Sequence, residues 1–268
     1  TAKRNNLRLK FDTNWTYQPA PESRSAASIA PRYELFIGGD WKKPLSGKYF
    51  GTINPATEEK LSEVAEAGEK DVALAVQSAR SAYEKYWKKM PAPERAKYIF
   101  RIARMVQEKA RELAIIETLD GGKPIRESRD FDVPTAANHF FYYAGWADKL
   151  EYAFPNRRVA PLGVAGQIIP WNFPFLMAIW KIAPALAAGN TIILKPASYT
   201  PLSALKMVEI IHETFDEYLP GRKIHCHAVP YVKPEPEEVT IAWINNKMIE
   251  TGTKLNKLAA ESGIDYTQ

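Results

Sequence analysis

Apolar residues recur at helical spacing in two long stretches of the first half of the chain, 72–86 and 96–116. Spacing of three and four residues places apolar side chains on one face of an α-helix. Pro93 suits the first turn of the second helix, and the pair Gly121-Gly122 suits its end. We therefore predict one helix over each stretch and a third within 132–149.

Shorter alternating stretches predict strands before these helices. Residues 33–41 alternate between apolar and polar around Gly38-Gly39, a pair typical of a tight hairpin turn. Residues 49–53 and 61–65 have the length and composition of two further strands.

The second half of the chain holds a strand, a helix and a strand in succession. Residues 163–169 and 191–195 are apolar enough for buried strands, and 175–188 between them has helical spacing. Thr200 is a suitable cap for a following helix that ends near Phe215. This order predicts a β-α-β unit, a parallel sheet and an α/β fold.

The chain divides into three parts by composition. Residues 1–32 are basic and rich in Pro, Ser and Ala, which is typical of an extended N-terminal arm. Residues 33–221 hold the predicted α/β domain. Residues 222–268 differ in character, with a Pro- and Glu-rich linker at 230–238 and an amphipathic helix at 239–261. We expect the arm or this tail to bind a protein partner.

Composition narrows the possible partners and compartments. The net charge of +5 is spread along the chain without a polybasic run, which argues against nucleic-acid binding. The most apolar stretch, 168–194, contains Lys181 and three prolines, so we expect no membrane span. Cys226 is the single cysteine, which excludes an intrachain disulfide. The expectation is a soluble protein of the cytosol or the mitochondrial matrix.

Two short motifs carry candidate chemistry. Asn172 stands between Pro170 and Pro174, so its carboxamide is an uncharged hydrogen-bond donor on a restricted backbone, which is what an oxyanion requires. The pair Lys195-Pro196 ends a predicted strand, where a lysine can meet a nucleotide ribose or phosphate.

These motifs and three others, in the same order, resemble the aldehyde dehydrogenase family. The matching stretches are 36–41, 53–58, 117–124, 170–174 and 195–197. The resemblance implies the Rossmann-like cofactor-binding domain of that family. It also implies oxidation of an aldehyde to an acid with NAD or NADP: a cysteine thiolate attacks the carbonyl, Asn172 stabilises the oxyanion by about 3 kcal/mol, hydride passes to the cofactor, and a glutamate activates water.

The resemblance also implies cofactor contacts. Lys195 matches the family lysine that contacts the adenosine ribose or its 2′-phosphate, and backbone groups of Ile168, Ile169 and Trp171 match further contacts. Many NAD-preferring members carry a glutamate where this chain has Ser198. A neutral hydroxyl tolerates a 2′-phosphate, so NADP is compatible with this site as well as NAD.

Several family motifs are absent after residue 221. The sequence has no Gly-x-Thr-x-x-Gly pattern for the pyrophosphate, no Glu-Leu-Gly-Gly and no Gly-Gln-x-Cys. We therefore expect a non-catalytic relative that acts as a structural or interaction subunit of a larger assembly. Two alternatives remain: a part of an active NAD(P)-dependent aldehyde dehydrogenase, and a weak NAD(P)-binding module. For Asn172 the corresponding alternative is a retained turn residue, and for Lys195 and Ser198 a solvated strand end.

Two other groups of residues have less specific interpretations. Cys226 lies between His225 and His227, which is compatible with a nucleophile or a metal site, but ordinary strand residues are the favoured interpretation and no metal is expected. Glu117, Asp120 and Glu127 stand near predicted helix ends, and we expect them to be solvated surface charges.

Overall fold

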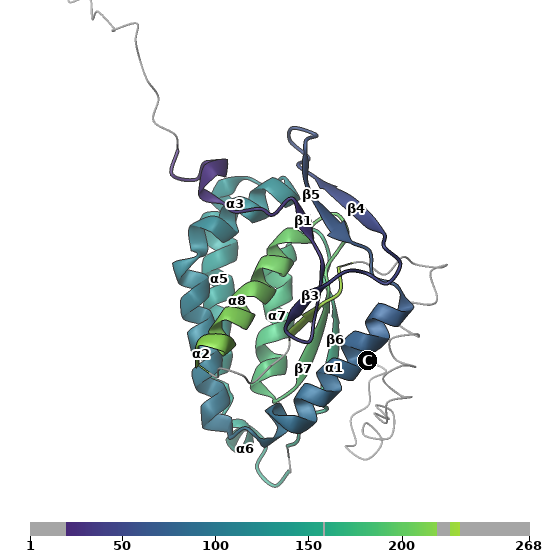
Figure 1. Cartoon of the computed structure of the whole chain (residues 1–268). Coiled ribbons are helices and arrows are strands. Elements are labelled where there is room, and N and C mark those ends of the chain that lie inside the picture. Colours follow the sequence, from purple (N-terminus) through teal and green to yellow (C-terminus); the bar gives the residue numbers. More distant parts are fainter. Residues whose placement is uncertain (1–19, 158, 219–225, 231–268) are drawn as a thin grey trace, which may run out of the picture.

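The computed structural model describes residues 20–157, 159–218 and 226–230 (Figure 1). The strands are β1 (Arg32–Tyr33), β2 (Leu35–Ile37), β3 (Asp40–Lys42), β4 (Tyr49–Ile53), β5 (Lys60–Ala65), β6 (Val164–Ile168), β7 (Thr191–Lys195) and β8 (Cys226–Ala228). The main helices are α1 (Glu69–Lys85), α2 (Ala92–Glu108), α3 (Ala110–Gly121), α5 (Val133–Trp146), α7 (Pro174–Ala187) and α8 (Leu202–Tyr218). The short helices are η1 (Arg24–Ala26), η2 (Trp87–Lys89), α4 (Ile125–Glu127), η3 (Ser128–Asp132, a π-helix) and α6 (Leu150–Ala153). In the described part, strands β1 to β5 precede helices α1 to α6, and strands and helices alternate only from β6 to β8.

The described strands form two sheets. The larger sheet has the order β3-β2-β8-β7-β6. Strands β6, β7 and β8 are parallel to one another, and β2 is antiparallel to both of its neighbours, β8 and β3. The smaller sheet has the order β1-β5-β4. The predicted α/β fold is confirmed, and so is the hairpin at Gly38-Gly39, where both glycines have positive φ angles of 72° and 83°. The hairpin makes the larger sheet mixed rather than wholly parallel.

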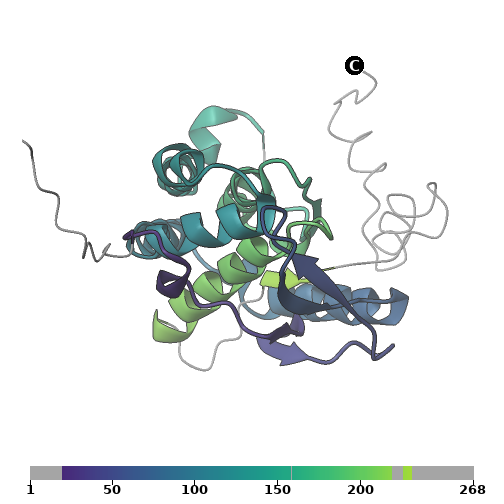
Figure 2. The ribbon, with the colours of Figure 1, turned by 90° about the horizontal axis from the view of Figure 1, so that it is seen from above.

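Helices cover both faces of the larger sheet (Figure 2). Helix α1 packs on one face, α7 and α8 pack on the other, and α2 and α5 form an outer layer against them. Strand β7 alternates between the two layers: Ile193 faces the α1 side, while Ile192 and Leu194 join the core beneath α7 and α8. A central parallel strand is apolar on both faces for this reason.

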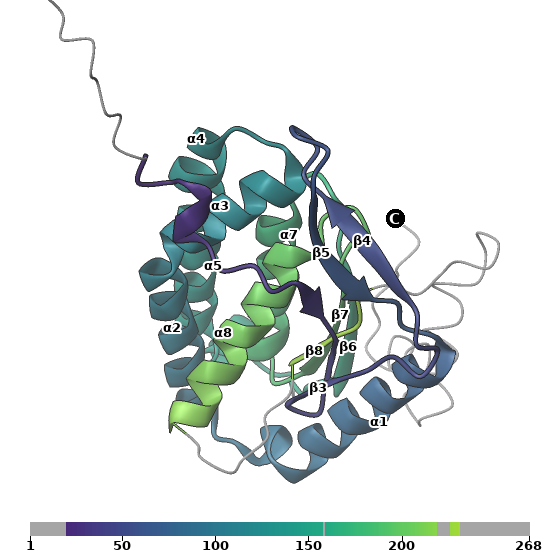
Figure 3. The same ribbon diagram turned by 45° about the horizontal axis from the view of Figure 1, so that its top comes forward.

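The single helix predicted from 96 to 116 is two helices in the structure. The backbone leaves helical geometry at Lys109 (φ −93°, ψ 13°), although neither glycine nor proline marks the break. The Lys109 ammonium lies 2.6 Å from Glu213 Oε2 on α8. The break lets α3 cross beside the starts of α7 and α8 (Figure 3).

Two segments outside the predicted 33–221 domain, residues 20–31 and 226–228, contribute to the described domain. Residues 20–31 run over α3, where the Ser28 N–H donates to Glu112 Oε1 at 3.2 Å. Strand β8 pairs with β7 and β2 inside the larger sheet, so residues 226–228 belong to the domain although they follow residue 221. Residues 1–19 of the expected arm, and the expected linker and helix from 231 onward, lie outside the described residues.

Glu117 and Asp120 are buried, and the expectation of solvated charges was wrong for both; Glu127 is exposed as expected. The two carboxyls occupy core positions one turn apart on α3 and accept hydrogen bonds from backbone and hydroxyl groups. Burial raises the pKa of Glu117 and of Asp120 to about 7, although neighbouring donors, and for Glu117 the Lys123 ammonium, oppose the shift.

In the part of the chain that the structure describes, no helix is both long enough and apolar enough to cross a bilayer.

Gly122 ends α3 in the left-handed conformation (φ 71°), and a Cβ atom there would lie 2.5 Å from Pro55 Cγ. We predict that Gly122→Ala lowers the free energy of unfolding by about 2 kcal/mol. Gly145→Ala is the matched control, because this exposed glycine of α5 has no atom within 4 Å of a new Cβ. It should raise stability by about 0.5 kcal/mol. Urea unfolding measures both, and equal effects would contradict the backbone argument.

The raised pKa of Glu117 predicts a pH-dependent stability. Between its ordinary value of 4.5 and about 7, the unfolded chain loses a proton that the folded chain keeps, so the free energy of unfolding falls as the pH rises. The total loss is about 3 kcal/mol and is complete above about pH 7. Glu117→Gln removes this ionisation. The free energy of unfolding of Glu117→Gln, relative to that of the wild type, should therefore rise by about that amount from pH 4.5 to 8. Glu127→Gln should show no such trend.

Candidate cofactor and oxyanion site

The carboxyl ends of β6 and β7 bring the two sequence motifs together. Ile168 is the register partner of Lys195, and the Ile169 N–H donates to the Lys195 carbonyl oxygen at 3.0 Å. Ligands of open α/β sheets bind outside the carboxyl ends of parallel strands. The loop that follows β6 carries Trp171 and Asn172, and the loop that follows β7 carries Ser198, so both loops lie at this edge of the sheet. We call the space outside this edge, between the two loops, the crevice.

Asn172 lies in the bend between β6 and α7 and is exposed. Its carboxamide makes no hydrogen bond with any described residue, so both N–H groups remain available to an acceptor. Pro174 begins α7 directly after this bend, and the positive end of the helix dipole favours negative charge there. The neighbouring Phe173 ring is held under the Lys123 ammonium, 4.1 Å from the ring centroid. The arrangement suits an oxyanion.

Lys195 and Ser198 lie half-buried on the other side of the crevice. Burial lowers the pKa of the Lys195 ammonium. The two loops touch, because the Thr200 hydroxyl donates to the Trp171 carbonyl oxygen at 3.5 Å. Thr200 was expected to cap α8, but the first N–H of that helix, from Leu202, donates to Asp120 Oδ2 at 2.7 Å.

The three residues expected to contact the cofactor through their backbones, Ile168, Ile169 and Trp171, differ in whether their groups are already bonded or exposed. The Ile169 N–H is already bonded to β7. Backbone groups alternate along a strand, so those of Ile168 point to the open side of β6, the edge strand of the described sheet. Trp171 presents a side chain that is 62% exposed.

The side chains at the crevice have the chemistry to contact one part of a dinucleotide. A lysine with a small neutral hydroxyl three residues later can bind a ribose or a 2′-phosphate. The Leu202 N–H at the start of α8 is already bound by Asp120, so this group is not offered to a pyrophosphate.

Cys226 begins β8 and is the register partner of Ile192, three residues before Lys195. At about 3.3 Å per residue, its backbone lies roughly 10 Å below the strand ends. This register places the backbone of Cys226 away from the Asn172 loop, which favours the interpretation as an ordinary strand residue. His227 is buried, and its Nδ1 accepts the Gly38 N–H at 3.1 Å. Among the described residues, no three His, Cys, Asp or Glu side chains gather to hold a metal ion.

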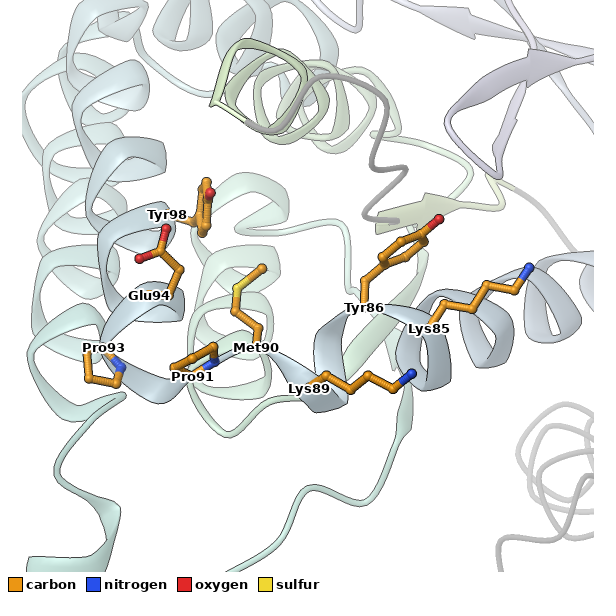
Figure 4. A pocket seen from close by; sticks show the side chains of 8 residues that line it. All are labelled: Lys85, Tyr86, Lys89, Met90, Pro91, Pro93, Glu94 and Tyr98. Atoms are coloured by element: carbon orange, nitrogen blue, oxygen red, sulfur yellow. The ribbon is translucent and has the colours of Figure 1, made fainter.

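Two cavities lie elsewhere in the described domain. One of about 700 Å³ lies between the end of α1 and the start of α2, lined by Lys85, Lys89 and Tyr98 among others (Figure 4). The other, of about 460 Å³, lies between α2 and α5 beside Phe100 and Phe141. Neither includes a residue of the crevice.

Sequence reasoning missed Glu117 and Asp120 as residues of the site's support. A signal was present, since the helical spacing of Leu113 and Ile116 continues to positions 117 and 120. Acidic residues on the core face of a helix indicate buried, bonded carboxyls.

The sequence pattern described as "Aldehyde dehydrogenase family" matches residues 41–222. Fluoroacetaldehyde dehydrogenase of Streptantibioticus cattleyicolor is 46% identical over 199 residues, which cover 70% of this chain and 38% of the relative. Human retinal dehydrogenase 2 is 45% identical over 191 residues, covering 67% of this chain and 37% of the relative. The chain thus spans under two fifths of the length of these relatives.

Solved structures agree with this relationship. The NAD⁺ complex of an aldehyde dehydrogenase from Bacillus cereus is 38% identical, with a TM-score of 0.70, and the match covers 80% of this chain and 44% of that one. The family pattern covers well over half of the sequence, and the solved relatives share its fold. The chain belongs to the aldehyde dehydrogenase family.

Proposed function

We propose that this chain provides the cofactor-binding and oxyanion-binding part of an NAD(P)-dependent aldehyde dehydrogenase. The observation that carries the proposal is the pairing of Ile168 with Lys195, which sets the Asn172 loop and the Lys195 loop on one crevice. Structural relatives that bind NAD support the cofactor class.

The proposed roles follow from the chemistry of each side chain. The Asn172 carboxamide donates to the oxygen of an aldehyde carbonyl as that oxygen gains negative charge. Lys195 and Ser198 bind the adenosine ribose, and a 2′-phosphate fits beside the lysine because Ser198 carries no charge. The bound nicotinamide accepts hydride. Backbone groups of Ile168 and Trp171 are the proposed additional contacts.

A thiolate and a general base are also required for aldehyde oxidation. The register of Cys226 keeps its backbone away from Asn172. We propose that these groups come from polypeptide outside the described residues, and that the described domain is non-catalytic by itself.

A second candidate function, that of an interaction subunit, is favoured by the surface beside the crevice. Trp171, Phe173 and Trp180 are 62%, 38% and 45% exposed; the first two lie in the bend before α7, and Trp180 lies within α7. Several large exposed apolar side chains along one short segment favour an interaction surface. A protein partner, or further sequence bearing the thiolate, is the proposed occupant, and the N-terminal arm and the C-terminal tail are other proposed contact regions.

Cofactor binding tests the primary proposal. We predict saturable binding of NADP to the whole chain by isothermal titration calorimetry. Lys195→Ala should weaken it by roughly 10-fold or more, because a charge-assisted contact to the ribose phosphate is lost. Lys149→Ala is the matched control, an exposed lysine paired with Asp148 between α5 and α6. A flat titration of wild type at millimolar NAD and NADP would refute the proposal.

Ser198→Glu tests the position that selects between the cofactors. A carboxylate there repels a 2′-phosphate and accepts ribose hydroxyls. The affinity for NADP should therefore fall by roughly 10-fold relative to the affinity for NAD. An unchanged ratio of the two dissociation constants would place the ribose away from Ser198.

Aldehyde oxidation by this chain alone tests the assignment of the nucleophile. We expect no NADH or NADPH formation with short aldehydes, because Cys226 lies roughly 10 Å below the strand ends. Turnover that disappears in Cys226→Ser would overturn that assignment.

A further inference from the structure

The last turn of α3 lies where the two site loops enter their helices (Figure 3). Glu117 and Asp120 are three residues apart on this turn, so their side chains share one face of the helix. Both are almost fully buried, with exposed fractions of 0% and 2%. The chemistry assigned above to the strand ends uses neither carboxyl.

The two carboxyls accept backbone N–H groups from the starts of different helices, and Ser203 of α8 also interacts with Glu117 and lowers its pKa. Glu117 Oε1 accepts the N–H of Phe175, the second residue of α7, at 3.4 Å. Asp120 Oδ2 accepts the N–H of Leu202, the first residue of α8, at 2.7 Å. Asp120 Oδ1 also accepts the Thr52 hydroxyl at 2.6 Å, which ties the same turn to β4.

The bonded amides are close in sequence to the site. Phe175 follows Asn172 by three residues, and Leu202 follows Ser198 by four. One helical turn of α3 is therefore bonded next to both loops of the crevice. Buried hydrogen bonds to carboxylates are stronger than neutral ones and do not compete with water.

We propose that Glu117 and Asp120 are positioning residues, which fix the separation of Asn172 from the Lys195–Ser198 loop by bonding the starts of α7 and α8. The inference rests on the proposed function in so far as these loops form the proposed site. The bonds of the two carboxyls can be tested without any cofactor.

The charged groups that face this turn are few. Lys123 Nζ lies 3.9 Å from Glu117 Oε1 and 2.6 Å from Asp132 Oδ2 in η3. Asp132 raises the pKa of Glu117, and Glu117 raises that of Asp120. On α8, the charged residue nearest in sequence to Leu202 is Lys206. Its ammonium pairs with Glu112, which lies at the other end of α3.

The ionisation of these carboxyls should change the bonds near neutral pH. Loss of the proton makes each carboxyl a stronger acceptor for the helix N–H groups. Because the pKa of each is about 7, the site loops should respond over the range from pH 6 to 8.

The test is ¹H–¹⁵N NMR of the whole ¹⁵N,²H-labelled chain between pH 5.5 and 8.5. In wild type, the amide signals of Phe175 and Leu202 should titrate with midpoints near 7, together with the Trp171 indole and the Ser198 amide. Glu117→Gln should abolish the titration at Phe175 and Trp171. Asp120→Asn should abolish it at Leu202 and Ser198.

Glu127→Gln is the matched control, an exposed glutamate on the neighbouring α4, and it should leave all four titrations in place. Folded variants in which Trp171 and Ser198 still titrate as in wild type would overturn the proposal. If a variant fails to fold, the wild-type signals decide the question: Phe175 and Leu202 amides that do not move with pH would also overturn it.

A cofactor arm separates this inference from the proposed function. In wild type the dissociation constant of NADP should change several-fold between pH 6 and 8, and Asp120→Asn should remove most of that change. Absence of NADP binding would refute the proposed function, while the pH response of the free chain would still support the positioning role.

Discussion

The hydrogen bond from the Leu202 N–H to Asp120 joins the start of α8 to the last turn of α3, two segments that are far apart in sequence. Together with the bond from the Phe175 N–H to Glu117, it fixes the starts of α7 and α8 to the last turn of α3. These carboxyls are costly to bury, and burial raises the pKa of both. The unfavourable burial of these carboxyls occurs where α3 meets the starts of α7 and α8, and the proposed geometry of the crevice depends on this contact.

The crevice contains only some of the groups that aldehyde oxidation requires. The parallel pairing of β6 with β7 brings the proposed oxyanion donor, Asn172, and the proposed ribose-binding lysine, Lys195, to adjacent strand ends. The only cysteine of the chain stands at the opposite end of β8. The exposed Trp171 in the β6–α7 loop and the exposed Trp180 of α7 support the proposal that further polypeptide covers this surface. In the proposed assignment, this chain supplies the cofactor-binding and oxyanion-binding groups, and other polypeptide supplies the nucleophile.

Sequence patterns predicted the β-α-β unit, because helical and alternating periodicity reflect burial on one face. The hairpin at Gly38-Gly39 followed from local turn chemistry. The break at Lys109 could not be predicted, because neither glycine nor proline marks it and the packing of α3 beside α7 and α8 decides it. The burial of Glu117 and Asp120 depends on donors that are distant in sequence, although their core-face spacing was a usable signal.

The most direct test of the site is a crystal structure of this chain grown with NADP. The adenosine ribose and its 2′-phosphate are expected at the ends of β6 and β7, in contact with the Lys195 ammonium and the Ser198 hydroxyl. Adenosine density elsewhere, for example in the cavity beside Lys85 and Lys89, would contradict the assignment.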